Sequence, residues 1–318
     1  MRSPSASPVA LSAKSRRACS KQANQADSPT TLLHKSGRNK AGVANRRTYV
    51  TATRLAVLRQ QLKPRQWALL SDVGRLNLAS GEQLRRLHYA DSLSGQRLAR
   101  LDLKDLVDKR VLTRLGRTIG GRRAGSEGWT FALGVAGQRL LRPDQRRHRE
   151  PWTPDTSHLR HALAVSELYV QLRTLETGGQ TQLEMFDTEP RCWRFFRGPG
   201  GSPVTLKPDA FVVSGNDDYL DSWFVELDRG TESRTRILAK AKLYWRYFQS
   251  GREQSGTGVF PSVVFTVLTD QRRAQLVDTL KRLETDQRQL FQVVTADRAA
   301  VAMTSDELLN DSPREATA

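Results

Sequence analysis

Apolar residues recur at helical spacing in three segments between residues 64 and 109. Pro64 suits the first turn of the first helix, and Ser80 suits the N-terminal cap of the second. In the third helix, expected over residues 94–109, apolar positions at i, i+4 and i+7 share one face: Ala99, Leu103 and Leu106. The pattern therefore predicts three short helices that pack on a common core.

After the third helix, the pattern changes to two strands, VLTRLGR and WTFALGVAG, around the glycine-rich connection GGRRAGSEG. Helices followed by such a hairpin are typical of a winged helix-turn-helix, so residues 51–142 are predicted to form a DNA-binding domain of this kind. The expected DNA contacts are cations of the third helix and of the connection: Arg97, Arg100, Lys104, Arg122 and Arg123. Winged helices also bind proteins, and that alternative stays open.

A second unit is expected after residues 143–156, which contain three prolines and no apolar period and so predict a linker. Helices are expected near residues 158–176, 231–248 and 271–286, and strands near 182–187, 204–213, 222–228, 262–268 and 291–295. Residues 157–300 are therefore predicted to form a domain with the core order αβββαβ. The fold class is α+β with two domains, between a disordered basic arm (1–50) and a disordered tail (301–318).

The net charge changes sign along the chain. It is +9 over residues 1–50, +12 over 51–150 and −3 over 151–318. A cationic front part joined to a slightly acidic back part is expected when the first binds double-stranded DNA and the second has another task. The alternative is that the excess of arginine only keeps the protein in solution and does not bind DNA.

The cellular compartment is predicted from the membrane, secretory and cysteine patterns that the sequence lacks. No apolar run reaches the ~18 residues of a membrane-spanning helix, and the N-terminal segment has no apolar stretch of the kind found in secretory signals. Cys19 and Cys192 form neither a disulfide framework nor a Cys-x-x-Cys metal site. We therefore expect a cytoplasmic protein with no membrane partner.

Acidic residues on two of the predicted strands are the candidate chemistry. Asp209 lies in LKPDAFVV, and Glu226 and Asp228 share one face of the strand WFVELDRG. If these strands pair as a hairpin, their carboxylates converge and suit Mg²⁺ or Mn²⁺, which activates water and neutralises a phosphodiester. Lys207, two residues before Asp209, is expected on the same face and would complete a phosphate site.

Asp209 is followed, after a gap of 16 residues, by Glu226-Leu227-Asp228, within the element order αβββαβ. This pattern resembles the PD-(D/E)xK nuclease superfamily. The resemblance implies that these acids hold the metal, that Glu167 on the preceding helix adds a ligand, and that a lysine acts in catalysis. The family pattern has Lys where this chain has Asp228, and two residues stand as substitutes, Lys207 and Lys240. Lys240 and Tyr244 resemble the Gln-x-x-x-Tyr helix motif of some such nucleases.

The predicted winged helix and linker are followed by three short motifs: His161-x-Leu163, Pro208-Asp209 and Glu226-x-Asp228-Arg229-Gly230-Thr231. Together these features are similar to the replication-relaxation family of actinobacterial plasmids and mobile elements, over about residues 50–290. The resemblance implies a role in the replication, relaxation or transfer of such DNA, with other replication or transfer proteins as partners. The alternatives are a non-catalytic replication factor and a transcriptional regulator with a degenerate nuclease fold.

Overall fold

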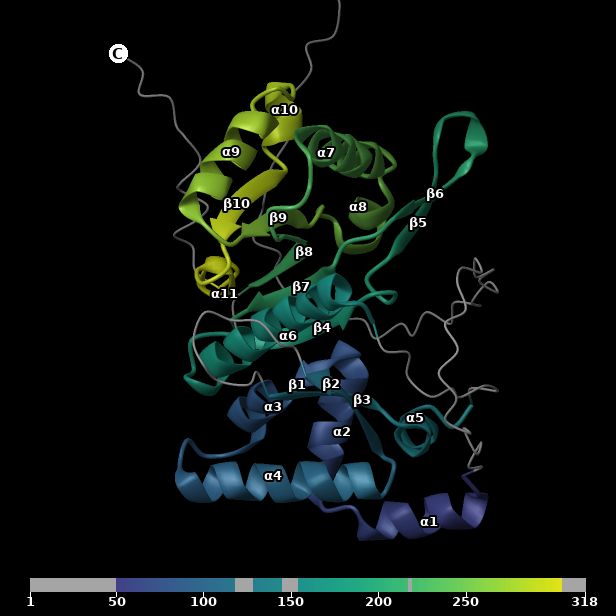
Figure 1. Cartoon of the computed structure of the whole chain (residues 1–318). Helices are drawn as coiled ribbons and strands as arrows, with labels where there is room; N and C mark the ends of the chain where they lie inside the picture. The colour runs from purple at the N-terminus through teal and green to yellow at the C-terminus, as the bar shows by residue number, and fades with distance from the viewer. Residues whose placement is uncertain (1–49, 118–127, 145–153, 217–218, 305–318) are drawn as a thin grey trace, which may run out of the picture.

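A computed structural model describes residues 50–117, 128–144, 154–216 and 219–304 (Figure 1), and the structural statements below refer to these residues. Helices alternate with three β-sheets in this part of the chain, so the predicted α+β class is confirmed. Within it, no helix is both long enough and apolar enough to cross a bilayer. Residues 1–49 of the basic arm, residues 305–318 of the tail and the connection that carries Arg122 and Arg123 lie outside the described residues. Val301 and Ala302 end a helix, and Ala302 and Met303 are buried, so the prediction of a disordered tail from residue 301 is wrong for these positions.

The N-terminal half packs short helices on a small antiparallel sheet with the strand order β1-β3-β2. Its elements are α1 (Ala52–Gln61), α2 (Pro64–Leu76), β1 (Ala79–Ser80), α3 (Gly81–His88), α4 (Leu93–Asp108), β2 (Leu112–Arg117), β3 (Trp129–Leu133) and α5 (Val135–Leu141). Pro64 opens α2 and Ala99, Leu103 and Leu106 of α4 are buried, as the sequence predicts.

Ser80 caps α3 through a reciprocal pair of hydrogen bonds. Its Oγ accepts a bond from Gln83 N (3.1 Å), and Gln83 Oε1 accepts one from Ser80 N (3.0 Å). Replacing Ser80 by Ala leaves a helical N–H without its acceptor, so we expect the free energy of unfolding to fall by about 1 kcal/mol. Denaturant titration measures this loss. Ser80→Asp, which keeps an acceptor, should be close to wild type, and an equal loss for both variants would contradict the capping role.

The C-terminal half is built on a five-stranded sheet with the order β10-β9-β8-β7-β4. β7 is antiparallel to both β4 and β8, whereas β9 is parallel to both β8 and β10. The strands are β4 (Gln182–Thr188), β7 (Ala210–Gly215), β8 (Leu220–Asp228), β9 (Ser262–Val267) and β10 (Phe291–Thr295). The remaining elements are α6 (Thr156–Thr177), β5 (Arg194–Arg197), the 3-10 turn η1 (Pro199–Gly201), β6 (Pro203–Leu206), α7 (Arg234–Gln249), α8 (Arg252–Thr257), α9 (Asp270–Leu280), α10 (Thr285–Arg288) and α11 (Ala299–Ala302). Figure 1 shows α6 on one face of the sheet and α7 and α9 on the other.

The strand predicted over residues 204–213 is two strands. β6 pairs only with β5 in a separate hairpin that extends away from the main sheet, and β7 begins at Ala210 (Figure 1). Pro208 lies between them, and a proline has no N–H for a sheet and restricts the residue before it. The break separates Lys207 from the strand that follows Asp209.

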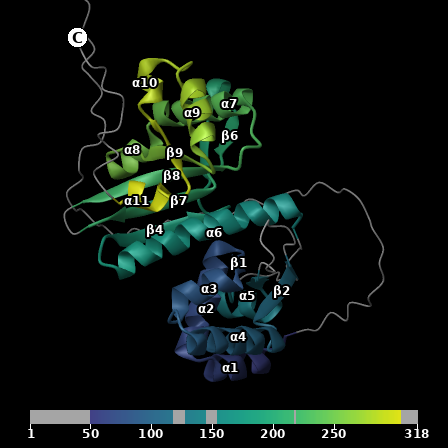
Figure 2. The same ribbon diagram turned by 60° about the vertical axis from the view of Figure 1, so that its left-hand side comes forward.

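The core is continuous between the two halves. One cluster of buried apolar residues contains Leu70 of α2, Leu172 of α6, Phe186 of β4 and Val225 of β8. Figure 2 shows α6 lying between the sheet and the N-terminal helices. The division into domains at residues 143–156 stays a prediction, but the two halves are packed together.

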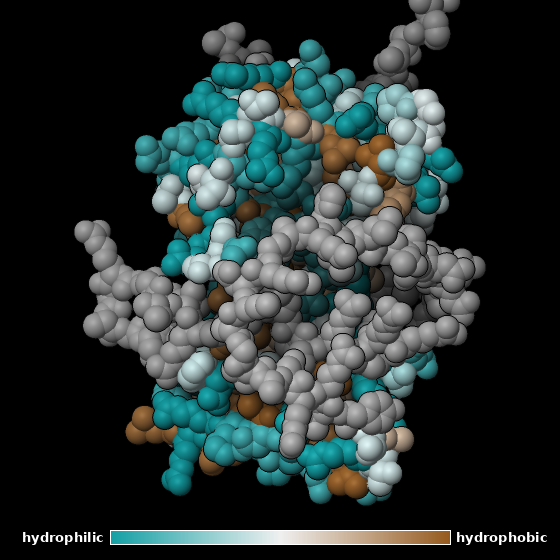
Figure 3. All heavy atoms as spheres, turned by 45° about the vertical axis from the view of Figure 1, so that its right-hand side comes forward, coloured by the Kyte–Doolittle hydropathy of each residue, from teal (hydrophilic) through white to brown (hydrophobic). Residues whose placement is uncertain are grey.

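Buried hydrogen bonds cross the same boundary. Ser166 Oγ donates to Leu78 O (2.6 Å), and Thr188 Oγ1 donates to Arg75 O (2.7 Å). On the face shown in Figure 3, hydrophilic residues cover most of the coloured surface and hydrophobic residues appear in small groups.

Candidate functional site

Glu226 lies on β8 of the central sheet, and Asp209 lies immediately before the neighbouring strand β7. β7 pairs antiparallel with β8, as predicted, and Asp209 immediately precedes β7. The backbone N–H of Asp209 donates to Val225 O (3.0 Å), and its carboxylate Oδ2 accepts a bond from Leu227 N (2.7 Å). Asp209 is therefore held beside Glu226 by the two residues that flank it.

Glu226 is 1% exposed, and two side chains of α7 bind its carboxylate. Lys240 Nζ donates to Oε2 (2.7 Å) and Tyr244 OH donates to Oε1 (2.6 Å). Residues four apart share one face of a helix, which is why both reach the same group. The structure thus brings three predicted site residues together: Asp209, Glu226 and Lys240.

Burial raises the pKa of the Glu226 carboxyl to about 8, and the negative charge of Asp209 adds to that rise. For Lys240, burial disfavours the ammonium form, but the charges of Glu226 and Asp209 outweigh it and hold the pKa above its usual range. Above about pH 8, both carboxyls are ionised, and Asp209 and Glu226 carry two negative charges against the one positive charge of Lys240. A cation bound here would lower that imbalance.

His161 is a site residue whose role the sequence analysis missed. Its Nε2 lies 3.1 Å from Asp209 Oδ1, and this hydrogen bond raises the pKa of the imidazole although burial opposes the rise. A cavity of about 290 Å³ adjoins the pair and is also lined by Glu189 and Leu78. The only signal in the sequence was the motif His161-x-Leu163, because helical spacing alone does not show which strand a helix will meet.

Two predicted site residues lie elsewhere. Glu167 faces α3, where Arg86 donates to Oε1 (2.6 Å) and Gln83 to Oε2 (3.1 Å), so the expectation that it joins Asp209 and Glu226 is wrong. Lys207 is exposed and lies over the ring of Trp193, with 4.3 Å from Nζ to the ring centre. It does not share a strand face with Asp209, because Pro208 breaks the strand between them.

Two groups of the protein bind the Asp228 carboxylate. Its Oδ2 accepts a bond from Arg272 Nε of α9 (2.5 Å), and its Oδ1 accepts one from Gly230 N (3.0 Å). Across the described ranges, no three His, Cys, Asp or Glu side chains are grouped so that they could hold a metal ion. The predicted set of four carboxylate ligands is therefore reduced to two, those of Asp209 and Glu226.

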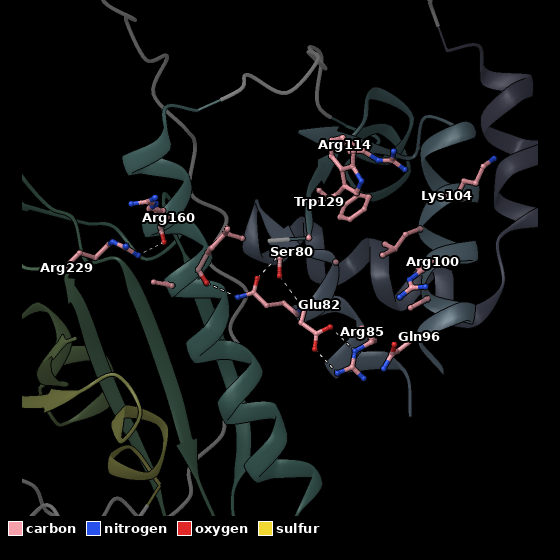
Figure 4. A pocket seen from close by; sticks show the side chains of 18 residues that line it. Ser80, Glu82, Arg85, Gln96, Arg100, Lys104, Arg114, Trp129, Arg160 and Arg229 are labelled. Atoms are coloured by element: carbon pink, nitrogen blue, oxygen red, sulfur yellow. Dashed lines mark hydrogen bonds and ion pairs between the residues drawn. The ribbon is translucent and has the colours of Figure 1, made fainter. Parts of the chain in front are cut away.

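The cations predicted on the third helix are all exposed on α4. Arg100 and Lys104 line a groove of about 1190 Å³ between α4 and α6, whereas Arg97 does not line it. Figure 4 shows this groove, with Arg160 and Arg229 at the side of α6. The other two predicted DNA contacts, Arg122 and Arg123, lie outside the described residues.

Comparison with known proteins gives one family match. A family model described as replication-relaxation matches residues 70–263. None of the curated proteins matches the chain. Among solved structures, the restriction endonuclease FokI bound to DNA matches with 13% sequence identity and a TM-score of 0.24, which is too low to establish a shared fold. That match covers 76% of this chain but only 44% of the FokI chain.

Proposed function

Because the chain belongs to the replication-relaxation family, we propose that it binds DNA of a plasmid or mobile element and cuts one of its strands during replication, relaxation or transfer. The N-terminal half, as a winged helix, would supply DNA binding, and the C-terminal half, as a nuclease-like domain, would supply the cut. The single observation that carries this proposal is the meeting of Asp209, Glu226 and Lys240 in one buried cluster.

DNA binding is supported by charge and by the shape of the N-terminal half. Residues 51–150 carry a net charge of +12, and the exposed side of α4 presents Arg97, Arg100 and Lys104. α4 follows α3 and precedes the hairpin of β2 and β3, which is the order expected for a winged helix. Cations on such a helix contact base edges or phosphates.

The carboxylates of Asp209 and Glu226 suit Mg²⁺ or Mn²⁺, since Mg²⁺ is usually bound by one or two carboxylates and completes its shell with water and substrate phosphates. Such an ion supplies an activated water and positive charge for a phosphodiester. The chain's own groups would assist. The Lys240 ammonium would stabilise a phosphate oxygen, and His161, bonded to Asp209, would hold that carboxylate in place.

A second candidate is a DNA-binding replication factor or regulator without catalytic activity. It is favoured by a specific observation: all four carboxylate oxygens of Asp209 and Glu226 already have a partner within the protein. In that case the cluster only stabilises the fold, as buried ion pairs often do elsewhere.

Nicking of supercoiled plasmid separates the two candidates. We expect the wild-type chain to convert supercoiled plasmid to open circles in Mg²⁺ and not in EDTA. Asp209→Asn, which keeps the size and the bond to Leu227, should reduce nicking to the EDTA background. Glu167→Gln is the matched control, because Glu167 was expected in the site from the sequence but is bonded to Arg86 and Gln83.

Equal nicking by the wild type and Asp209→Asn would refute the catalytic proposal. If, in addition, the chain binds one DNA sequence in EDTA and supports replication with Asp209→Asn in place, the non-catalytic candidate holds. A loss of nicking in Glu167→Gln equal to that in Asp209→Asn would show that the assay reports damage to the fold.

A further inference from the structure

The groove between α4 and α6 has two walls of different origin. α3, α4 and β3 form one wall, and α6 with Arg229, the residue after β8, forms the other (Figure 4). Six cations line it: Arg85, Arg100, Lys104, Arg114, Arg160 and Arg229. Among the described lining residues, Glu82 is the single acid, and Arg85 pairs with it (2.6 Å). Lys104 pairs with Asp108 outside the lining (2.6 Å), which leaves four arginines in excess, Arg100, Arg114, Arg160 and Arg229. The groove is therefore strongly positive, which suits a polyanion.

An aromatic side chain lies among these cations. Trp129 of β3 lines the groove, and the Arg114 guanidinium carbon lies 4.6 Å from its ring centre. Figure 4 shows the two side chains together near the end of the groove that Lys104 also borders. Aromatic rings and guanidinium planes both offer a surface on which a nucleic-acid base stacks. A positive groove with such a surface is typical of sites that bind unpaired bases.

The shape of the groove argues against a duplex. A helix reads a duplex by entering its major groove, so it must project from the protein. The side of α4 with Arg100 and Lys104 instead faces α6 across a hollow. Because α6 forms a second wall opposite these residues, the groove favours one strand with exposed bases between the walls over a base-paired duplex.

We propose that this groove binds a segment of single-stranded DNA. The inference deepens the proposed function, and rests on it for the identity of the nucleic acid. Arg229 follows Asp228 at the end of β8, the strand that carries Glu226, and Arg229 Nη1 donates to Arg160 O at the wall of the groove (3.0 Å). Single-stranded DNA bound along the groove therefore reaches the end of β8, the β-strand that carries Glu226 of the carboxylate cluster.

The test measures binding of the full chain to a labelled 12-nucleotide single strand and to the same sequence as a duplex, by fluorescence anisotropy in EDTA. The groove variant combines Arg100→Ala, Arg114→Ala and Arg160→Ala. The control variant removes the same charge from exposed positions outside the groove, with Lys242→Ala, Lys281→Ala and Arg282→Ala. None of these residues belongs to the carboxylate cluster, and no cleavage is needed for the measurement.

We expect the groove variant to bind the single strand at least about tenfold more weakly, with a salt slope smaller by about 2, since each phosphate contact with a single strand contributes about 0.7. The control variant should stay within about twofold of wild type, because screened charges far from a ligand contribute little. Tryptophan fluorescence should be quenched by the single strand in the wild type, and much less in Trp129→Phe, because a base stacks on this ring.

Unchanged binding of the single strand in the groove variant would overturn the proposal. Equal losses for single strand and duplex would show a general phosphate surface and would also overturn it, as would unchanged quenching in Trp129→Phe. Because these measurements are made without metal, they are independent of nicking. A chain that never nicks plasmid can still show the expected binding of single-stranded DNA, and a chain that nicks plasmid can lack it.

Discussion

Lys240→Met is expected to lower the free energy of unfolding by about 3 kcal/mol at pH 9, above the raised pKa of Glu226, because it leaves the ionised Glu226 carboxylate buried without its cation. Glu226 is 1% exposed and cannot turn toward water, whereas Lys240 retains about a quarter of its side-chain surface in contact with solvent. The exposed part of Lys240 places the effect at the lower end of the range for buried pairs. Urea denaturation followed by circular dichroism measures it.

The partner variant makes the prediction specific. Glu226→Gln should cost less, because Lys240 can still pair with Glu232 at 3.5 Å and reach water. The double variant Lys240→Met, Glu226→Gln should recover most of the loss seen in Lys240→Met, which gives a coupling energy of about 2 kcal/mol. Lys242→Met, on the exposed side of the same helix, is the control and should change stability by less than about 0.5 kcal/mol. A double variant as unstable as the sum of the two single variants would contradict the ion pair.

Phe186→Ala is expected to cost about 3 to 5 kcal/mol, the usual loss when a fully buried phenyl ring is removed. Phe186 on β4 is 0% exposed and packs edge-on against Tyr169 of α6, with 5.0 Å between the ring centres. It belongs to the cluster that also contains residues of α2. The N-terminal helices should therefore lose stability together with the sheet, and both halves should unfold in one transition.

Met185→Ala is the matched control for this change. Met185 precedes Phe186 on β4 but is 43% exposed, so its truncation should cost less than about 0.5 kcal/mol. Tryptophan fluorescence reports on both halves, because Trp67 lies in α2 and Trp223 in β8. Two separate transitions in Phe186→Ala, with the N-terminal helices unaffected, would show that the core is not shared.

Patterns within single elements predict the parts of the site that depend on one strand or one helix. Alternation along β8 places Glu226 and Asp228 on one face, and spacing along α7 brings Lys240 and Tyr244 to the same carboxylate. The antiparallel pairing of β7 and β8 follows from their closeness in the chain. These predictions need no knowledge of distant residues.

Contacts between distant elements could not be predicted in this way. Arg272 binds Asp228 from a helix 44 residues later, and Glu167 binds Arg86 across 81 residues. Both pairings depend on which helix packs on which face, and the spacing of apolar residues does not encode this. Lys207 was misplaced for a local reason, because Pro208 was treated as part of a continuous strand although it cannot join a sheet there.

The continuous core has a consequence for where DNA is cut. A nuclease unit on a flexible tether can reach a range of phosphates, but here α6 contacts both the N-terminal helices and β8, the strand that carries Glu226. Under the proposed function, the protein then fixes the distance between binding site and cut. The broken bond lies a constant number of nucleotides from the DNA sequence that the N-terminal half binds.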